Sequence, residues 1–245
     1  MKRWTWLLAA LCLGLTACRG PIEPDLSAYE TSGTAQVPSE EKYIALTFDD
    51  GPRRGTTEKL LQGLRERDAR ATFFMIGQQI PGNEDLLQQM AADGHQLGDH
   101  TYTHAQLSKL TPDLATEEIR KTETLLEKAV GPDEFWLRPP YGLIDKAQAA
   151  VVKTPMVYWS VDPEDWKVLD TQKVVDHVLS HVKPGSIVLL HDFYPTSVDA
   201  ALILVDKLQA EGYTFVTVEE LFSLQGIEPQ TGHLYATAER EIKIH

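Results

Sequence analysis

The sequence predicts an α/β domain that forms a distorted (β/α) barrel of about seven parallel strands. Short apolar runs bounded by turn residues recur through residues 42–222, and amphipathic stretches separate them. Strands that alternate with helices build right-handed βαβ units around a parallel sheet. That many strands in one domain favour a closed or nearly closed barrel. No run is followed by a glycine-rich phosphate loop, which argues against an open nucleotide-binding sheet.

The individual elements follow from local patterns. The apolar run 43–46 leads to a Gly51-Pro52 turn and predicts a buried first strand. Leu60, Leu61 and Leu64 form the inner stripe of the first helix. Further strands are expected near residues 71–76, 95–100, 134–137, 156–160, 186–190 and 214–218. Helices are expected near residues 56–67, 84–92, 112–130, 146–152, 173–181 and 198–211.

The N-terminal residues predict a lipoprotein signal peptide. Residues 1–17 begin with basic side chains, continue with an apolar stretch too short for a comfortable membrane span, and end before Cys18 like a bacterial lipobox. We expect cleavage before Cys18 and lipidation of that residue; an ordinary or uncleaved signal peptide is the alternative. Residues 18–41 predict a flexible tether, 42–222 the main domain and 223–245 a peripheral C-terminal tail.

Composition restricts the partners and the ligands. The chain of 245 residues suits one large domain, and its net charge of −13 argues against nucleic acid or anionic lipid as a partner. Its two cysteines, Cys12 and Cys18, precede the domain, so a metal site within the domain would use histidine and carboxylate ligands. A monomer is the default expectation for the oligomeric state.

Two adjacent carboxylates end the first strand. Asp49 and Asp50 would point to opposite faces of a regular strand, but a strand end bent by Gly51 and Pro52 can aim both at one spot. Two crowded carboxylates repel, so one should keep its proton unless a cation or an arginine relieves the repulsion. The chemistry alone leaves open which aspartate meets which positive charge.

Two histidines offer a metal site. His100 and His104 are four residues apart, so on a helical turn they share a face. With one carboxylate from the aspartate pair they would supply three protein ligands on one side of an ion, which leaves the other side open for catalysis. Such a set suits Zn²⁺ first, with Co²⁺, Ni²⁺ and Mn²⁺ as alternatives.

Two more strand ends carry polar groups. Arg138 could pair with the second aspartate, and the prolines before Tyr141 could hold its backbone N–H in a fixed direction, as an oxyanion donor requires. His191 ends an apolar strand and suits a general acid. Either Asp162 or Asp165 could orient that histidine.

Five motifs occur in one order: TFDDGP (47–52), HTYTH (100–104), RPPY (138–141), DPEDW (162–166) and LLHD (189–192). Together they resemble the polysaccharide deacetylase family, carbohydrate esterase family 4, whose domain is named for the chitooligosaccharide deacetylase of nodulation. The resemblance covers residues 42–222, and no motif position departs from the family pattern.

The resemblance implies a role for each motif residue. It implies Asp49 as general base steadied by Arg138, and a divalent ion held by Asp50, His100 and His104. It further implies His191 as general acid oriented by Asp162. The remaining implied contacts to the substrate are the Tyr141 N–H on the oxyanion, and Trp166 and Leu189 around the acetyl group.

The activity implied is hydrolytic N-deacetylation of N-acetylglucosamine residues in an acetylated glycan polymer or oligomer, with peptidoglycan first and a chitin-like glycan second. The lipid anchor would place the protein outside the cytoplasm at the cell envelope, held to a membrane. Two alternatives are an O-deacetylase of acetylated xylan and a non-catalytic carbohydrate-binding lipoprotein.

No catalytic or metal-binding role is expected for His95, His177 and His181. His95 precedes the HTYTH motif and is expected to be structural or to support the metal ligands. His177 and His181 are also four residues apart, but no carboxylate motif accompanies them, so a helix surface is expected.

Overall fold

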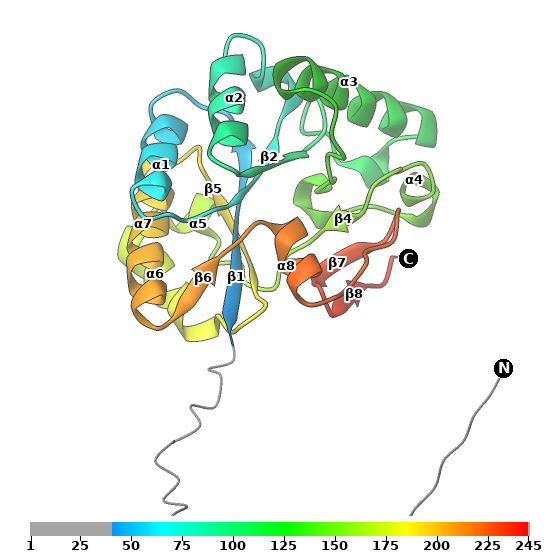
Figure 1. Cartoon of the computed structure of the whole chain (residues 1–245). Coiled ribbons are helices and arrows are strands. Elements are labelled where there is room, and N and C mark those ends of the chain that lie inside the picture. The colour runs from blue at the N-terminus through cyan, green and yellow to red at the C-terminus, as the bar shows by residue number, and fades with distance from the viewer. Residues whose placement is uncertain (1–40, 245) are drawn as a thin grey trace, which may run out of the picture. The chain divides into compact units, whose positions relative to one another are not determined.

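A parallel sheet forms the centre of the computed structural model, which describes residues 41–244 (Figure 1). Strand β1 (Lys42–Gly51) lies between β2 (Thr72–Met75) and β5 (Ile187–His191), and β3 (Gln96–Asp99) continues the sheet beyond β2. Strand β6 (Tyr213–Phe215) pairs with the beginning of β1. All of these pairs are parallel, which confirms the predicted α/β class.

The sheet continues beyond β3 and β5 through single-residue bridges. Asp99 bridges Leu137, and Leu137 bridges Met156 of β4 (Met156–Val157). On the other side, Val161 bridges Val188 of β5. The strand expected near 134–137 is therefore reduced to one bridging residue, and closure into a barrel stays a prediction.

Residues 234–242 form two strands where the sequence predicted a peripheral tail. Strand β7 (Leu234–Thr237) pairs in parallel with β4, and β8 (Arg240–Ile242) pairs antiparallel with β7. Leu234 and Ala236 are buried. The prediction failed here because the partner strand, β4, is far away in the sequence, so the local pattern does not carry the pairing.

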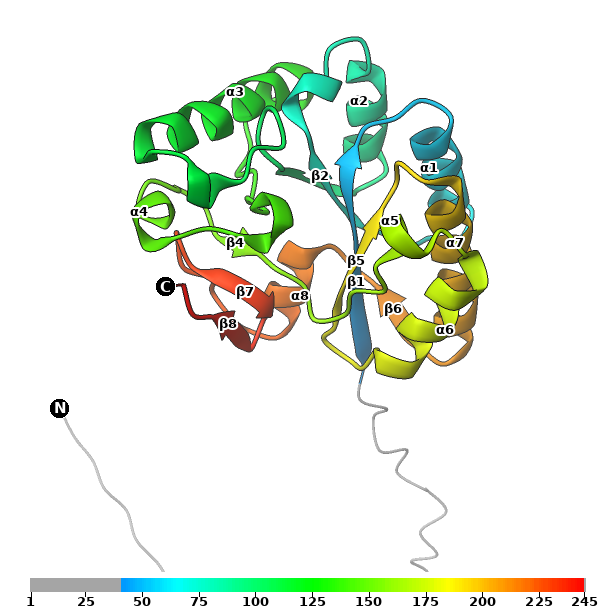
Figure 2. The ribbon, with the colours of Figure 1, turned by 180° about the vertical axis from the view of Figure 1, so that it is seen from behind.

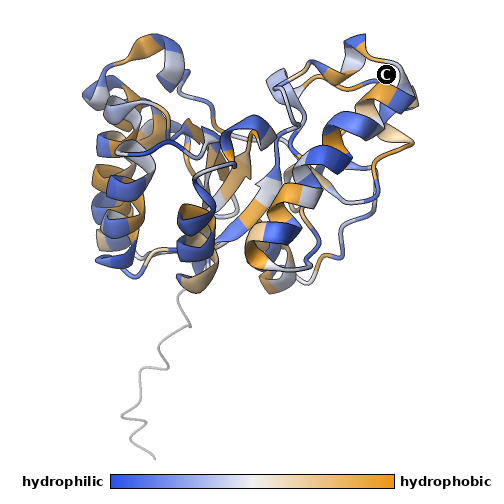
Figure 3. Ribbon diagram, turned by 90° about the horizontal axis from the view of Figure 1, so that it is seen from above, coloured by the Kyte–Doolittle hydropathy of each residue, from blue (hydrophilic) through white to orange (hydrophobic). Residues whose placement is uncertain are grey.

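Helices cover the sheet, and the view from behind shows the same arrangement (Figure 2). Helix α7 contacts α1 and α6, and α2 contacts α3. Viewed from above, the helices carry both hydrophilic and hydrophobic residues, as amphipathic elements do (Figure 3). Their bounds are α1 Thr56–Arg65, α2 Glu84–Ala92, α3 Pro112–Val130, α4 Lys146–Ala149, α5 Asp165–Val168, α6 Thr171–His181, α7 Pro195–Ala210 and α8 Val218–Leu224.

The main core lies between β1, β2 and β5 and the helices beside them. Phe48 and Phe73 stack in it with ring centroids 5.2 Å apart. This core fixes where the strands end, and thus where the polar residues after them lie. None of the helices within residues 41–244 has the length and apolar character needed to cross a membrane. The predicted signal peptide, Cys18 and the tether up to residue 40 lie outside the described residues.

Candidate active site

The carboxyl ends of the parallel strands surround one pocket of about 370 Å³. Almost all of the predicted site residues line it, although they come from segments far apart in the sequence. The exceptions among the described residues are Arg138, which is fully buried behind Asp49, and Asp165, which is also fully buried. The lining residues are Asp49, Asp50, His100, His104, Tyr141, Trp159, Asp162, Trp166, Leu189, His191 and Tyr194.

Asp50, His100 and His104 form a candidate metal centre. One ligand atom from each lies within 4.8 Å of the others, and Oδ1 of Asp50 is 3.7 Å from His100 Nε2 and 3.5 Å from His104 Nε2. These distances are too long for hydrogen bonds, and Oδ1 of Asp50 is buried without a hydrogen-bond partner within the described part of the chain. A cation among the three groups would satisfy that oxygen, so the residues fit a divalent metal.

The hydrogen bonds of His100 prepare it as a ligand. Its Nδ1 lies 2.7 Å from the carbonyl oxygen of Arg138. Because a carbonyl can only accept, Nδ1 carries a proton, which leaves Nε2, 3.7 Å from Oδ1 of Asp50, as the nitrogen that would bind an ion. The RPPY loop thereby fixes the orientation of an imidazole from the HTYTH loop.

Asp49 is paired with Arg138. The guanidinium Nη1 donates to Asp49 Oδ1 at 2.8 Å and to the hydroxyl of Thr47 at 2.7 Å. Burial opposes ionisation of Asp49, but the charges of Arg138, His100 and His191 outweigh it and lower the pKa of this carboxyl. The guanidinium also lies over the ring of Phe74, 4.2 Å from its centroid. Asp49 is therefore an ionised carboxylate in a water-poor position.

His191 is held by Asp165. Its Nδ1 lies 2.7 Å from Oδ1 of Asp165, and its backbone N–H donates to Oδ2 of the same carboxylate at 2.8 Å. Burial lowers the pKa of His191, but Asp165 more than compensates, and the pKa rises to about 9. His191 is thus a protonated imidazole at neutral pH, with Nε2 free to face the pocket.

The expectation that Asp162 orients His191 is wrong. Oδ1 of Asp162 instead accepts the backbone N–H of Glu164 at 2.8 Å, in a turn that brings Asp165 back toward His191. Glu164 has φ 52°, the left-handed conformation that makes this turn possible. The other candidate weighed from the residues alone, Asp165, has the orienting position.

Tyr141 has a free backbone donor. Its φ of 61° is left-handed, and no backbone hydrogen bond within residues 41–244 is donated by its N–H. The next residue, Gly142, packs so closely that a Cβ there would lie 2.2 Å from Cε2 of Tyr158. Only glycine fits at residue 142, so close to Tyr158. This packing fixes the loop and holds the N–H of Tyr141 in one direction.

Left-handed backbone concentrates at this site. Most of the non-glycine residues with positive φ among those described lie at the candidate site: Asp50 near the end of β1, and Thr101, His104, Tyr141 and Glu164 in the segments that follow later strands. Such conformations cost on the order of 1–3 kcal/mol each and persist where surrounding packing imposes them. The strain indicates side chains preorganised by the fold.

Aromatic residues form the rest of the pocket wall. Trp166 is 48% exposed, whereas Leu189 is only 4% exposed. Trp159, which stacks on Tyr158, and Tyr194, whose ring centroid is 6.4 Å from that of His191, also line the pocket. Trp159 and Tyr194 were not predicted from the sequence. Only their closeness to DPEDW and LLHD could have suggested them.

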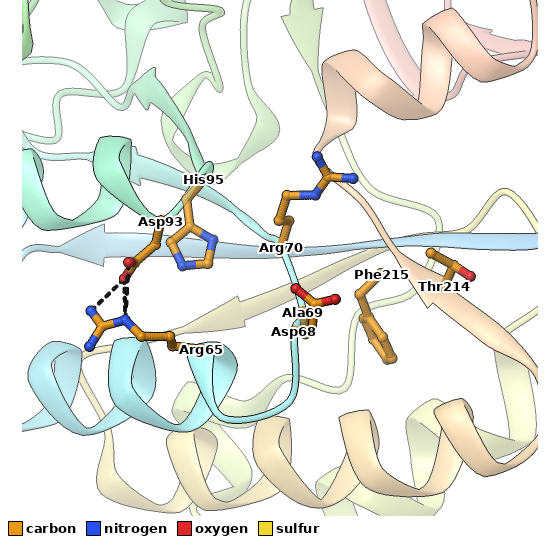
Figure 4. Close-up of a pocket in the computed structure, with 8 residues that line it drawn as sticks. All are labelled: Arg65, Asp68, Ala69, Arg70, Asp93, His95, Thr214 and Phe215. Carbon is orange, nitrogen blue, oxygen red and sulfur yellow. Dashed lines mark hydrogen bonds and ion pairs between the residues drawn. The ribbon is translucent and has the colours of Figure 1, made fainter.

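His95 lies away from this site. It precedes β3, beside a cavity of about 290 Å³ whose residues are shown in Figure 4. Its Nδ1 accepts the N–H of Ala71, and burial lowers its pKa to about 4. The neighbouring Arg65 and Asp93 pair with each other. His95 is thus a neutral structural histidine.

His177 and His181 stack on an exposed part of α6, as expected of a helix surface.

The chain is similar to a known protein family and to several known proteins. The profile of the family described as "Polysaccharide deacetylase" matches residues 36–158. A peptidoglycan-N-acetylglucosamine deacetylase of Bacillus cereus is 38% identical over 196 residues, which span 77% of this chain and 92% of that protein. The chain belongs to the polysaccharide deacetylase family.

Other similar proteins are named for different substrates. Peptidoglycan-N-acetylmuramic acid deacetylase PdaC of Bacillus subtilis is 38% identical over 185 residues, 76% of this chain but 40% of PdaC. A bifunctional xylanase/deacetylase of Pseudobutyrivibrio xylanivorans is 36% identical over 193 residues, 77% of this chain and 32% of that protein. The chain thus spans well under half the length of both relatives.

Solved structures of related proteins share the fold. The structure titled "T48 deacetylase with substrate" superposes with a TM-score of 0.76 at 41% identity, covering 80% of this chain and 96% of that one. A family 4 acetyl xylan esterase from Clostridium thermocellum, in complex with a cobalt ion, has a TM-score of 0.76 at 29% identity, covering 80% and 98%. A mutant of a family 4 pseudoenzyme with restored activity has a TM-score of 0.70 at 27% identity, covering 74% and 68%.

Proposed function

We propose that the protein is a metal-dependent deacetylase that hydrolyses the N-acetyl group of N-acetylglucosamine residues in a polysaccharide and releases acetate. Peptidoglycan is the first substrate and a chitin-like glycan the second. One observation carries the proposal: an ionised carboxylate, a protonated imidazole and a three-ligand metal set line one pocket. These are the groups that metal-assisted amide hydrolysis requires.

Asp50, His100 and His104 would hold the cation, zinc by preference and Co²⁺, Ni²⁺ or Mn²⁺ otherwise. When bound, a divalent cation supplies Lewis acidity, which polarises the acetamide carbonyl and makes water more acidic. The donor set of two imidazoles and one carboxylate supports this choice.

Asp49 acts as the general base. Its carboxylate lies beside the metal set, with Oδ2 3.6 Å from His100 Nε2, and Arg138 keeps it ionised. In this role it accepts a proton from the attacking water, and the hydrogen bond from Arg138 to Oδ1 leaves Oδ2 free for that proton.

His191 acts as the general acid, and Tyr141 supports the oxyanion. The imidazolium of His191 donates its Nε2 proton to the leaving nitrogen, and Asp165 holds the ring in the direction needed. The backbone N–H of Tyr141 donates to the oxygen that becomes negative when water attacks. Trp166 and Leu189 line the part of the pocket that would receive the acetyl methyl group.

Acetate release tests the proposal. Purified protein with Zn²⁺, Co²⁺, Ni²⁺ or Mn²⁺ is given N-acetylglucosamine tetramer, peptidoglycan and acetylated xylan, and acetate is measured. We expect acetate from the first two. Acetate from xylan alone would favour O-deacetylation, a candidate that the similarity to a xylanase/deacetylase and an acetyl xylan esterase supports. No acetate from any substrate would favour a non-catalytic binding protein, since a pseudoenzyme shares this fold.

We also propose that Cys18 is lipidated and anchors the protein outside the cytoplasm, at the cell membrane or envelope. The lipobox-like end of residues 1–17 supports this location. Labelling with a fatty acid should mark the wild-type chain but not Cys18→Ala. Equal labelling of both chains would contradict the anchor.

A further inference from the structure

Asp162 is a carboxyl group in the active-site pocket that has no role in the proposed chemistry. Asp49 is paired with Arg138, His191 is paired with Asp165, and Asp50 belongs to the metal set. Asp162 lines the same pocket and makes no ion pair with another side chain in the part of the chain that the structure describes. A half-buried carboxylate of this kind is stabilised by a hydrogen-bond donor, which a bound ligand could supply.

The register of the strands places Asp162 on the pocket side. Val161 bridges Val188 in parallel, and both valines are buried in the main core. Asp162 therefore lies beside Leu189. Because successive side chains of a strand point to opposite faces, both side chains face away from that core. Leu189 lines the pocket, and His191 follows it on the same face two residues later. Asp162 thus lines the pocket on the same side as His191, the proposed general acid.

One oxygen of Asp162 remains available. Oδ1 accepts the Glu164 N–H at 2.8 Å, which fixes the side chain. Oδ2 has no hydrogen-bond partner within residues 41–244, and it is not among the buried oxygens that lack one. This oxygen is therefore accessible from the pocket. An aspartate oxygen that is held in place, accessible and free is suited to accept a hydroxyl proton from a ligand.

The other residues that line the pocket indicate which kind of ligand it would bind. Aromatic rings of Tyr141, Trp159, Trp166 and Tyr194 surround the catalytic groups. Apolar rings beside a fixed carboxylate acceptor suit a pyranose, which presents C–H faces to rings and hydroxyls to acceptors. We propose that Asp162 binds a ring hydroxyl of the hexosamine unit whose acetyl group is removed, and that it sets sugar affinity rather than the protonation of His191.

This inference rests on the proposed deacetylation of a glycan, but binding tests it separately. Calorimetry measures the dissociation constant for N-acetylglucosamine tetramer, and acetate release gives kcat, KM and the pH profile. For Asp162→Ala we expect the dissociation constant and KM to rise about ten- to hundredfold, as for loss of a hydrogen bond to a charged group. We expect kcat to change by less than about threefold, and the alkaline limb of the pH profile to stay in place.

Three further variants make the test decisive. Asp162→Asn keeps an oxygen for the Glu164 N–H, so it reports on affinity even if Asp162→Ala folds poorly; it should weaken binding less. Asp165→Asn should instead lower kcat and move the alkaline limb. Asp176→Asn, an exposed carboxylate on α6, should change neither.

Two outcomes overturn the inference. One is unchanged tetramer binding in both Asp162 variants, or no binding by the wild-type protein. The other is a shifted alkaline limb in Asp162→Asn, which would return the orienting role to Asp162. A wild-type protein that binds the tetramer without releasing acetate contradicts the proposed function, while the dissociation constants still decide the role of Asp162.

Discussion

Asp165 contacts His191 at two points: Oδ1 lies 2.7 Å from the imidazole Nδ1, and Oδ2 accepts the His191 backbone N–H at 2.8 Å. The carboxylate is fully buried, so it acts on the histidine with little screening by water. Asp165 sets the direction of the ring, and it raises the pKa of His191 more than Asp49 and Asp50, which also raise it.

Replacement of Asp165 by asparagine should remove the charge and keep most of the shape. The pKa of His191 is raised to about 9, so the acid is protonated throughout the neutral range, and the wild-type rate should fall only as pH approaches that value. In Asp165→Asn the alkaline limb should move toward the ordinary histidine value of about 6.5, and kcat at pH 8 should fall about a hundredfold. An unmoved alkaline limb would show that another group is the acid.

The same contact should make stability depend on pH. The pKa of His191 is higher in the folded state than in the unfolded chain, so its contribution is fully present below pH about 6.5 and is lost as pH rises through about 9. Urea unfolding of metal-free wild type and Asp165→Asn should show a gap on the order of 3 kcal/mol at pH 6 that shrinks by pH 10. A gap that is constant with pH would contradict this linkage.

Metal should stabilise the fold through Asp50, His100 and His104. Free metal at about 100 times its dissociation constant should raise the free energy of unfolding by about 2.7 kcal/mol. A chelator should abolish acetate release, and added Zn²⁺ should restore it. Thermal melts should show the gain in the wild type and none in the double variant Asp50→Ala with His100→Ala; metal stabilisation of that variant would place the ion elsewhere.

Gly142 should be essential to the Tyr141 loop. Its φ is +66°, and an added Cβ would meet the ring of Tyr158 at 2.2 Å. Gly142→Ala should therefore combine backbone strain of about 1–2 kcal/mol with overpacking of about 1–3 kcal/mol, and it should lower kcat by displacing the Tyr141 N–H. Gly212→Ala is the control, because φ is +85° there but the space around it is open. Equal losses in urea unfolding would mean that the close approach is unimportant.

The sequence located the candidate site because its residues follow apolar strands. Asp49 and Asp50 at the end of β1, His100 after β3 and His191 at the end of β5 could each be placed from a local pattern. Parallel strands bring their carboxyl ends to one edge, so distant motifs could be expected to meet.

Choices that depended on non-local contacts could not be made from the sequence. Asp162 and Asp165 are both carboxylates near Trp166, and the Val161–Val188 bridge together with the left-handed turn at Glu164 decides between them. The strand β7 was missed for the same reason, since its pairing partner, β4, lies about 80 residues earlier in the chain.

The assignment of Asp49 as the base is tested by Asp49→Asn. The variant keeps an oxygen for the hydrogen bond from Arg138, and it leaves the ligands Asp50, His100 and His104 unchanged. We expect acetate release from N-acetylglucosamine tetramer to fall at least about a hundredfold, while bound metal per chain stays at the wild-type level. Turnover within about twofold of wild type, with metal bound, would contradict the account.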